Sequence, residues 1–263
     1  MTIWSFGASF AHLVDNENEQ WLRIVANSLD TNLRSYALTG SSSDLIFEKF
    51  NHTRHLIKEN DIVILSFAAM ERRWFIHERP DRAQIFSSLD DDKKENNAIK
   101  NYRKYLDNTI VPEIYILNFL YNLHSLTKKL NLHTILLITF PDLITTINNV
   151  YFPLFNISKG LLYNVSFNEI VENDHKALAS IYNNDLRLNH LCKSNHIILA
   201  NKIIKNIKEK TPIDLTQDFI KNILNEDNIN DHLLVKDELF DYAATTKIHQ
   251  IPWRELISKI NNY

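Results

Sequence analysis

The sequence predicts an α/β fold, a three-layer α/β/α sandwich built around a mostly parallel sheet. Residues 61–67 and 133–140 form largely apolar runs, which are typical of strands buried on both faces of a parallel sheet. Strand-like segments alternate along the chain with segments whose apolar residues recur at helical spacing. This alternation is typical of βαβ units with right-handed crossovers. We therefore expect one main α/β domain over residues 1–212.

The first elements follow the order strand, helix, strand, helix, strand. Residues 2–6 read as a strand that ends at Gly7, and residues 18–29 read as a helix. A second strand is expected over residues 34–38. The loop that follows resembles a helix N-cap, and residues 45–56 continue at helical spacing.

The later elements are less regular. A long helical region is expected over residues 99–130, interrupted near Pro112, and another helix over residues 193–207. No fifth strand can be placed between residues 141 and 184. After Pro212 the pattern changes to short helical pieces between acidic and Asn-rich turns, which predicts a helical C-terminal extension over residues 213–263.

Composition limits the function classes. The formal net charge of -3 gives no general basic field, so nucleic acid is not expected as a partner. The single cysteine, Cys192, excludes an intramolecular disulfide framework and a multi-cysteine zinc site. No secretory signal pattern and no apolar run of membrane-spanning length is found. We expect a cytoplasmic protein without a membrane span, cofactor or metal.

Glycine is scarce, since the chain has only Gly7, Gly40 and Gly160. Glycines kept in such a chain are expected where no Cβ is tolerated or where φ is positive. Gly7 and Gly40 both follow predicted strands, whose carboxyl ends form the ligand-binding edge of a parallel sheet. Ser9, just past Gly7, could present its hydroxyl there and its backbone N–H to a developing oxyanion. The alternative is that Ser9 only caps the next helix.

A second group of polar residues lies near the end of the predicted main domain. His190 stands in a predicted loop, and His196 opens an apolar helix six residues later. The first imidazole could lie above the sheet edge, anchored by the second. Residues 190–200 resemble the last block of SGNH/GDSL hydrolases, in which a catalytic histidine precedes a turn, a Gly-His pair and a helix. Asn195 replaces that glycine, and asparagine also tolerates left-handed geometry.

The N-terminal segment resembles the same family. Gly7-Ala8-Ser9-Phe10 matches its Gly-Asp-Ser block, and Gly40 matches the glycine of its second block. The resemblance covers roughly residues 1–210 and implies an SGNH-like domain of flavodoxin-like topology. It implies Ser9 as the nucleophile, His190 as the general base and the backbone N–H groups of Ser9 and Gly40 as the oxyanion hole.

The chain departs from the family pattern at three positions. Ala8 replaces the aspartate of the first block. The third block, normally Gly-x-Asn-Asp, carries Met70 in place of the asparagine that donates to the oxyanion. Arg187 stands where the triad aspartate is expected. Asp185 is the nearest replacement, and the alternative is that it caps a helix or pairs with Arg187.

Several residues could replace the missing oxyanion donor or bind substrate. Candidates to replace the missing amide donor are Ser66, Arg72 and Arg73. The two arginines, in a predicted loop over residues 71–75, could also bind a carboxylate, phosphate or sugar, or could simply pair with Glu71. Ser41, which follows the second strand, is a further substrate-binding candidate.

These residues lead to one main hypothesis, a serine-dependent ester hydrolase, either an esterase or a deacetylase. Its substrate would be an acylated carbohydrate or a similar small molecule, as the resemblance implies. Two alternatives stay open: an O-acyltransferase that modifies a glycan, with acyl-CoA as a candidate donor, and a noncatalytic binding module on a decayed scaffold. A metal-dependent hydrolase is not favoured, because no His-Glu-x-x-His or comparable ligand spacing occurs.

Overall fold

The structure is a computed structural model that describes residues 1–11, 13, 20–37, 41–67, 73–76, 83–86, 110–139, 141, 152–166, 169–170, 191, 193–220 and 223–224. Its strands and helices run along the chain in this order: β1 (Thr2–Gly7), the 3-10 turn η1 (Ser9–Ala11), α1 (Trp21–Ser28), β2 (Asn32–Ser35), α2 (Ser43–Thr53), the 3-10 turn η2 (Arg54–Leu56), β3 (Ile62–Ser66), β4 (Arg73–Ile76), β5 (Ala83–Phe86), α4 (Ile110–Leu130), β6 (His133–Leu137), β7 (Phe155–Ile157), α6 (Leu162–Ser166), β8 (Glu169–Ile170), α8 (Lys193–Glu209) and β9 (Ile223–Leu224).

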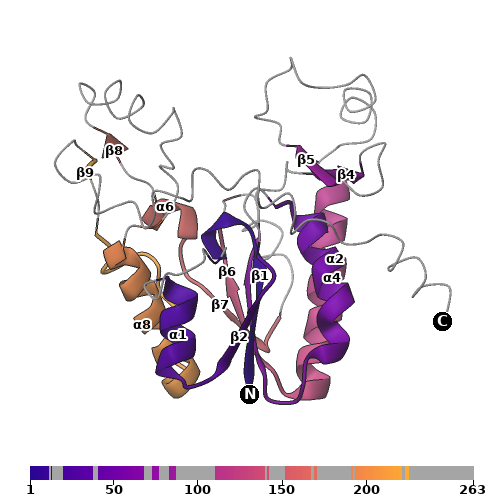
Figure 1. Ribbon diagram of the computed structural model, residues 1–263, viewed down its shortest axis with the longest axis horizontal. Coiled ribbons are helices and arrows are strands. Elements are labelled where there is room, and N and C mark those ends of the chain that lie inside the picture. The colour runs from indigo at the N-terminus through magenta and orange to yellow at the C-terminus, as the bar shows by residue number, and fades with distance from the viewer. Residues whose placement is uncertain are drawn as a thin grey trace.

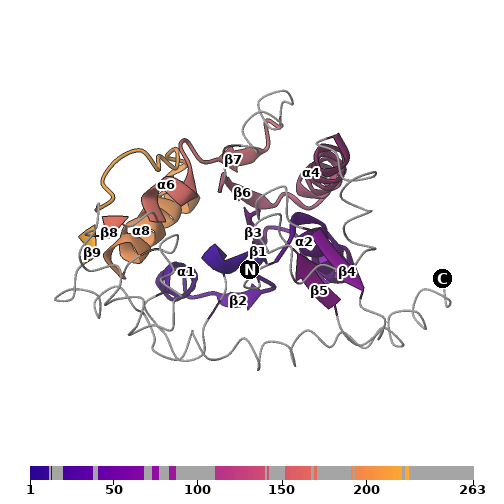
Figure 2. The same ribbon diagram turned by 90° about the horizontal axis from the view of Figure 1, so that it is seen from above.

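The centre of the molecule is a five-stranded parallel sheet with the order β2-β1-β3-β6-β7. This is the strand order of a doubly wound, flavodoxin-like sheet. Helices α1 and α8 cover one face, and α2 and α4 cover the other (Figures 1 and 2). The predicted three-layer α/β/α fold is therefore confirmed.

Side chains of β1 alternate between the two faces of the sheet and contribute to two separate hydrophobic cores. Trp4 and Phe6 point to the α2 and α4 layer, and Ile3 points to the α1 and α8 layer. The first core is rich in aromatic rings, among them Phe6 edge-on to Phe50, with centroids 5.5 Å apart. Complete burial of such a side chain stabilises the fold by about 1.5–3 kcal/mol. The second core is mostly aliphatic.

Two strands of the central sheet differ from what the sequence predicts. The fifth strand, which the sequence did not locate, is β7, a three-residue strand at the edge of the sheet. The second strand is β2, Asn32–Ser35, rather than residues 34–38. A strand as short as β7 has too few residues to show a two-residue period, so its position depends on pairing with β6.

The segment after Pro212 packs against the main domain. Ile213 and Leu215 are buried in the α1 and α8 core. The backbone of Asp214 forms an isolated parallel β-bridge with Lys159, which follows β7. Residues 213–220 contain no helix, and β9 pairs with β8. This described part differs from the predicted helical extension, while residues 225–263 lie outside the described residues.

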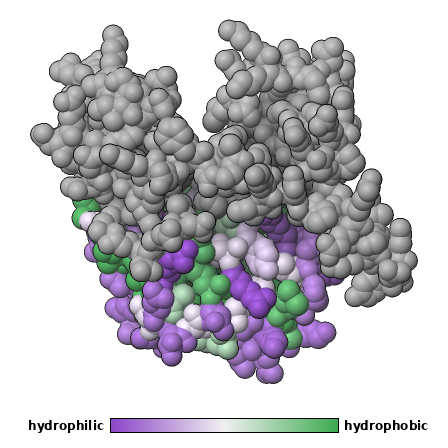
Figure 3. All heavy atoms as spheres, viewed as in Figure 1, coloured by the Kyte–Doolittle hydropathy of each residue, from purple (hydrophilic) through white to green (hydrophobic). Residues whose placement is uncertain are grey.

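The described surface in Figure 3 is mainly hydrophilic, with separate small apolar areas. Within the part of the chain that the structure describes, no helix combines the length and apolar character needed to cross a membrane.

Candidate active site

The topology of the sheet defines a switch point between β1 and β3. From β1 the chain moves outward through α1 to β2, whereas from β3 it moves in the opposite direction through α4 to β6. In open parallel sheets, ligands bind in the crevice outside the carboxyl ends of the strands at such a point. Ser9 follows β1 and Ser66 ends β3, so both lie at the switch point.

Gly7 is required by the close packing at this point. It pairs in register with Ser66 on β3. A Cβ on Gly7 would lie 2.2 Å from Ser66 Oγ, 2.8 Å from Ser66 O and 3.2 Å from Ala11 Cβ. The expectation that a retained glycine marks a position without room for a Cβ is confirmed here. Gly160 meets the other expectation, with φ at +84°.

Residues 8–11, which we call the Ser9 turn, are held by the surrounding backbone and side chains. Ala8 N–H donates to Ser66 O at 3.2 Å, and Ala11 N–H donates to Ala8 O at 3.0 Å. Trp21 Nε1–H donates to Phe10 O at 2.7 Å, and Ser35 Oγ donates to Ala11 O at 3.3 Å. These bonds join the turn to β2, β3 and α1.

Ser9 is the one residue of this turn that is not buried. Ala8, Phe10 and Ala11 are buried, whereas Ser9 is partly exposed. Its hydroxyl has no hydrogen-bond partner among the described residues. Helix α1 begins at Trp21 and has Gln20 as its N-cap, so the alternative in which Ser9 caps that helix is wrong.

Two buried serines at the carboxyl end of the sheet have hydroxyl groups that form no hydrogen bond with the residues the structure describes. Ser66, which is 1% exposed, and Ser42, the N-cap of α2, have Oγ atoms without a partner among the described residues. Burying an unpaired hydroxyl costs about 1–3 kcal/mol. Ser66 lies beside Gly7 and stays a candidate to replace the missing amide donor of the oxyanion hole. Ser41 is fully buried, and its substrate-binding role stays a prediction.

A buried histidine supports the start of α1. His196 Nδ1 accepts a hydrogen bond from Trp21 N–H at 3.3 Å, which places the ring proton on Nε2. Burial lowers the pKa of His196 to about 4, so the imidazole is a neutral acceptor at neutral pH. The sequence indicated His196 as an anchor for His190 but did not reveal its contact with Trp21.

Asn195 does not use the left-handed geometry that asparagine tolerates, because it lies inside α8. Its side-chain amide donates to Val165 O and Ile220 O and accepts from Ile220 N–H. In this chain the residue ties α8 to α6 and to the segment before β9.

Several predicted site residues cannot be placed. His190, Asp185, Gly40, Met70 and Arg72 lie outside the described residues, as does Arg187. Arg73 begins β4, which pairs antiparallel with β5, so the expectation of a loop over residues 71–75 is wrong from residue 73 onward. The roles of these residues stay predictions.

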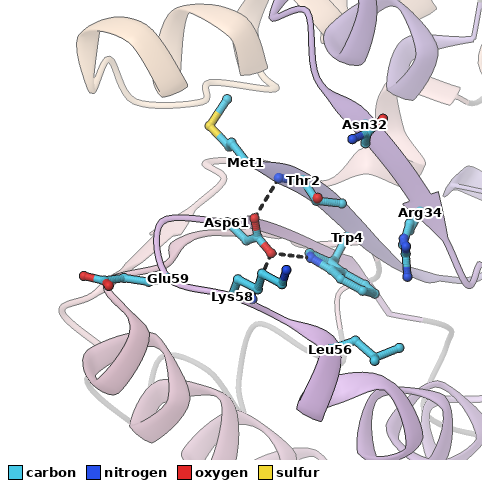
Figure 4. A pocket seen from close by; sticks show the side chains of 9 residues that line it. All are labelled: Met1, Thr2, Trp4, Asn32, Arg34, Leu56, Lys58, Glu59 and Asp61. Atoms are coloured by element: carbon cyan, nitrogen blue, oxygen red, sulfur yellow. Dashed lines mark hydrogen bonds between the residues drawn. The ribbon is translucent and has the colours of Figure 1, made fainter.

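A pocket of about 500 Å³ lies at the opposite, amino ends of β1, β2 and β3 (Figure 4). Asp61 accepts hydrogen bonds there from Thr2 N–H, Trp4 Nε1–H and Lys58 N–H. The Arg34 guanidinium lies over the Trp4 ring, 5.2 Å from its centroid. The lining has no serine, cysteine or histidine. The described lining of this pocket therefore lacks the nucleophile and base that ester chemistry needs.

The fold and the Ser9 turn define a doubly wound α/β protein with a serine at its topological switch point.

No protein-family model matches the chain, and no curated protein matches it.

Two solved structures match this chain over most of its length at low sequence identity. A psychrotrophic esterase from Pseudoalteromonas sp., inhibited by monoethylphosphonate, is 10% identical, with a TM-score of 0.45, and the match covers 80% of this chain and 97% of that one. A member of the lipolytic protein G-D-S-L family from Veillonella parvula is 11% identical, with a TM-score of 0.40, and the match covers 80% of this chain and 98% of that one. The second has the family name that the sequence motifs resemble, and the first is an esterase. The fold assignment rests on strand order and register.

Proposed function

We propose that the protein is a serine-dependent acyl-ester hydrolase in which Ser9 is the nucleophile. The observation that carries this proposal is the Ser9 turn. Of the residues in that turn, only Ser9 is not buried, and its hydroxyl is unpartnered among the described residues. A turn that is held by hydrogen bonds to β2, β3 and α1 and that presents a partly exposed hydroxyl at the switch point is suited to a positioned nucleophile.

The chemistry follows from the residue types. Ser9 Oγ attacks the acyl carbonyl, and its proton passes to the imidazole of His190, which later protonates the departing alcohol. Water then hydrolyses the acyl-serine. The Ser9 N–H would donate to the oxyanion, joined by Gly40 N–H, and Asp185 would orient His190. The substrate class is an acylated carbohydrate or a similar small ester.

The test is labelling of the full chain with a fluorophosphonate probe, which reacts with activated serines. The wild type is expected to be labelled, and Ser9→Ala is expected to lose the label. Ser28→Ala is the matched control, because Ser28 is an exposed serine at the end of α1. It should label like the wild type.

A second measurement follows acetate release from a panel of acetyl esters, including acetylated sugars. Ser9→Ala and His190→Ala should each lower the rate by at least about 1000-fold. A folded wild type that takes no label and releases no acetate would overturn the proposal. Retention of the label in Ser9→Ala would overturn the assignment of the nucleophile.

A further inference from the structure

Trp21 connects the Ser9 turn to helix α8 through two separate N–H groups. Its side chain is only 1% exposed and lies in the core between α1 and the sheet. The indole Nε1–H donates to the carbonyl of Phe10, the residue after Ser9, at 2.7 Å. The backbone N–H donates to His196 Nδ1 at 3.3 Å.

The second bond replaces an ordinary helix cap. Trp21 is the first residue of α1, and its N–H is one of the groups that a helix cannot pair internally. Gln20, the N-cap residue, makes no side-chain capping bond. A ring nitrogen from a different helix takes that place, so the start of α1 is held at a fixed position relative to α8.

We propose that Trp21 and His196 are positioning residues for the nucleophile, which hold the Ser9 turn in register with helix α8. The proposal rests on the proposed function of Ser9. Helix α8 begins at Lys193, three residues after His190, the predicted base. The same pair of bonds therefore links the segment of the nucleophile to helix α8, which follows the predicted base in the sequence. A displacement of about 1 Å at such a site can lower the rate by about 100-fold.

The chain offers a matched control for this idea. Trp4 is also a buried tryptophan, 2% exposed, and its Nε1–H also makes one short hydrogen bond, to Asp61 Oδ2 at 2.8 Å. That bond lies at the opposite end of the sheet (Figure 4). Trp21→Phe and Trp4→Phe each remove one indole N–H from a buried ring, so their effects on stability should be similar.

The experiment measures the rate constant of fluorophosphonate labelling and its final extent on the full chain. Trp21→Phe is expected to label about 10- to 100-fold more slowly than the wild type, with the same final extent. Trp4→Phe is expected to label within about twofold of the wild-type rate. Irreversible unfolding lowers the final extent of labelling. Reversible unfolding lowers the rate constant only in proportion to the folded fraction, which urea denaturation of each variant measures, so a larger decrease reports displacement of Ser9.

Variants of His196 supply a second, independent arm. His196→Asn places an acceptor oxygen near the position of Nδ1 and should keep a labelling rate close to that of the wild type. His196→Leu removes the acceptor and should slow labelling about as much as Trp21→Phe. Rescue by asparagine distinguishes positioning from simple packing.

The outcomes separate this proposal from the one on which it rests. An unlabelled wild type would overturn both. A labelled wild type with equal rates in Trp21→Phe and Trp4→Phe, or with equal rates in His196→Leu and His196→Asn, would overturn the positioning role and leave Ser9 as the nucleophile.

Discussion

The two ends of the parallel sheet treat their buried polar groups differently. At the amino end, the Asp61 carboxylate accepts three hydrogen bonds, from Thr2 N–H, Trp4 Nε1–H and Lys58 N–H. At the carboxyl end, the buried hydroxyls of Ser42 and Ser66 have no partner among the described residues. Polar groups that are satisfied within the fold stabilise it, whereas unpaired ones cost stability and are typical of sites with another use.

The largest expected effect on stability is at the amino end. Asp61→Ala leaves three buried or half-buried donors without their acceptor, and it should lower the free energy of unfolding by about 4 kcal/mol. Urea denaturation measures the change. Fluorophosphonate labelling of the folded fraction should proceed at the wild-type rate. A slower rate in folded protein would show that the two ends of the sheet are coupled.

Acidification should lower the stability of the protein through His196, which lies near the carboxyl end of the sheet. Its pKa is lowered from 6.5 to about 4 by burial, so an unfolded chain binds a proton at a higher pH than the native protein does. The contribution of neutral His196 to the free energy of unfolding is complete above pH 6.5 and is lost as the pH falls towards about 4. The total loss is about 3 kcal/mol.

The measurement is the free energy of unfolding between pH 4 and pH 7 for the wild type and for His196→Asn. Burial also lowers the pKa of His133, which contributes in the same direction in both proteins. The difference between the two pH profiles therefore isolates His196. Parallel profiles would contradict the prediction.

Gly7→Ala should affect both stability and chemistry. The added methyl meets Ser66 Oγ at 2.2 Å and Ser66 O at 2.8 Å, so the Ser9 turn or β3 must shift. We expect a loss of about 2 kcal/mol in stability and slower labelling of Ser9. Gly160→Ala is the control, because it is strained by a φ of +84° and by Thr216 Cγ2 at 2.8 Å, beside the edge strand. It should lose stability while its labelling rate stays that of the wild type.

The smallest expected effect is a gain in stability. Ser66→Ala and Ser5→Ala each remove a buried hydroxyl that has no partner among the described residues, and each should stabilise the fold by about 1 kcal/mol. Thermal unfolding measures this change, with Ser28→Ala as an exposed control. A loss of stability in Ser66→Ala would show that its hydroxyl is paired. Slower labelling in Ser66→Ala, but not in Ser5→Ala, would assign Ser66 to the site.

The fold could be predicted where local pattern and tertiary environment agree. The apolar runs at residues 61–67 and 133–140 contain β3, the central strand of the sheet, and β6, one of its two neighbours. Central parallel strands are buried on both faces, so hydrophobicity alone reveals them. The edge strand β7 and the segment over residues 213–220 lack such a signal, because their positions depend on pairing and packing with distant residues.

The candidate site was only partly predictable for the same reason. Ser9 follows a strand and a scarce glycine, a local pattern, and its role as nucleophile stays a prediction for the labelling experiment. Trp21 looked like one apolar residue among others of a helix. Its bond to Phe10 joins residues 11 positions apart, and its bond to His196 joins residues 175 positions apart. No periodicity in the sequence reports contacts of that kind.

By itself, the sequence determined the order of β1, β2, β3 and β6 with helices α1, α2, α4 and α8, and the position of the Gly7-Ala8-Ser9 segment at the end of the first strand. These features depend on neighbouring residues and on hydrophobic periodicity. Only the tertiary structure decided that Gly7 lies against Ser66 and that Trp21 bridges Phe10 and His196. Those contacts depend on the register between β1 and β3 and on the packing of α1 against α8, which bring together residues far apart in the chain.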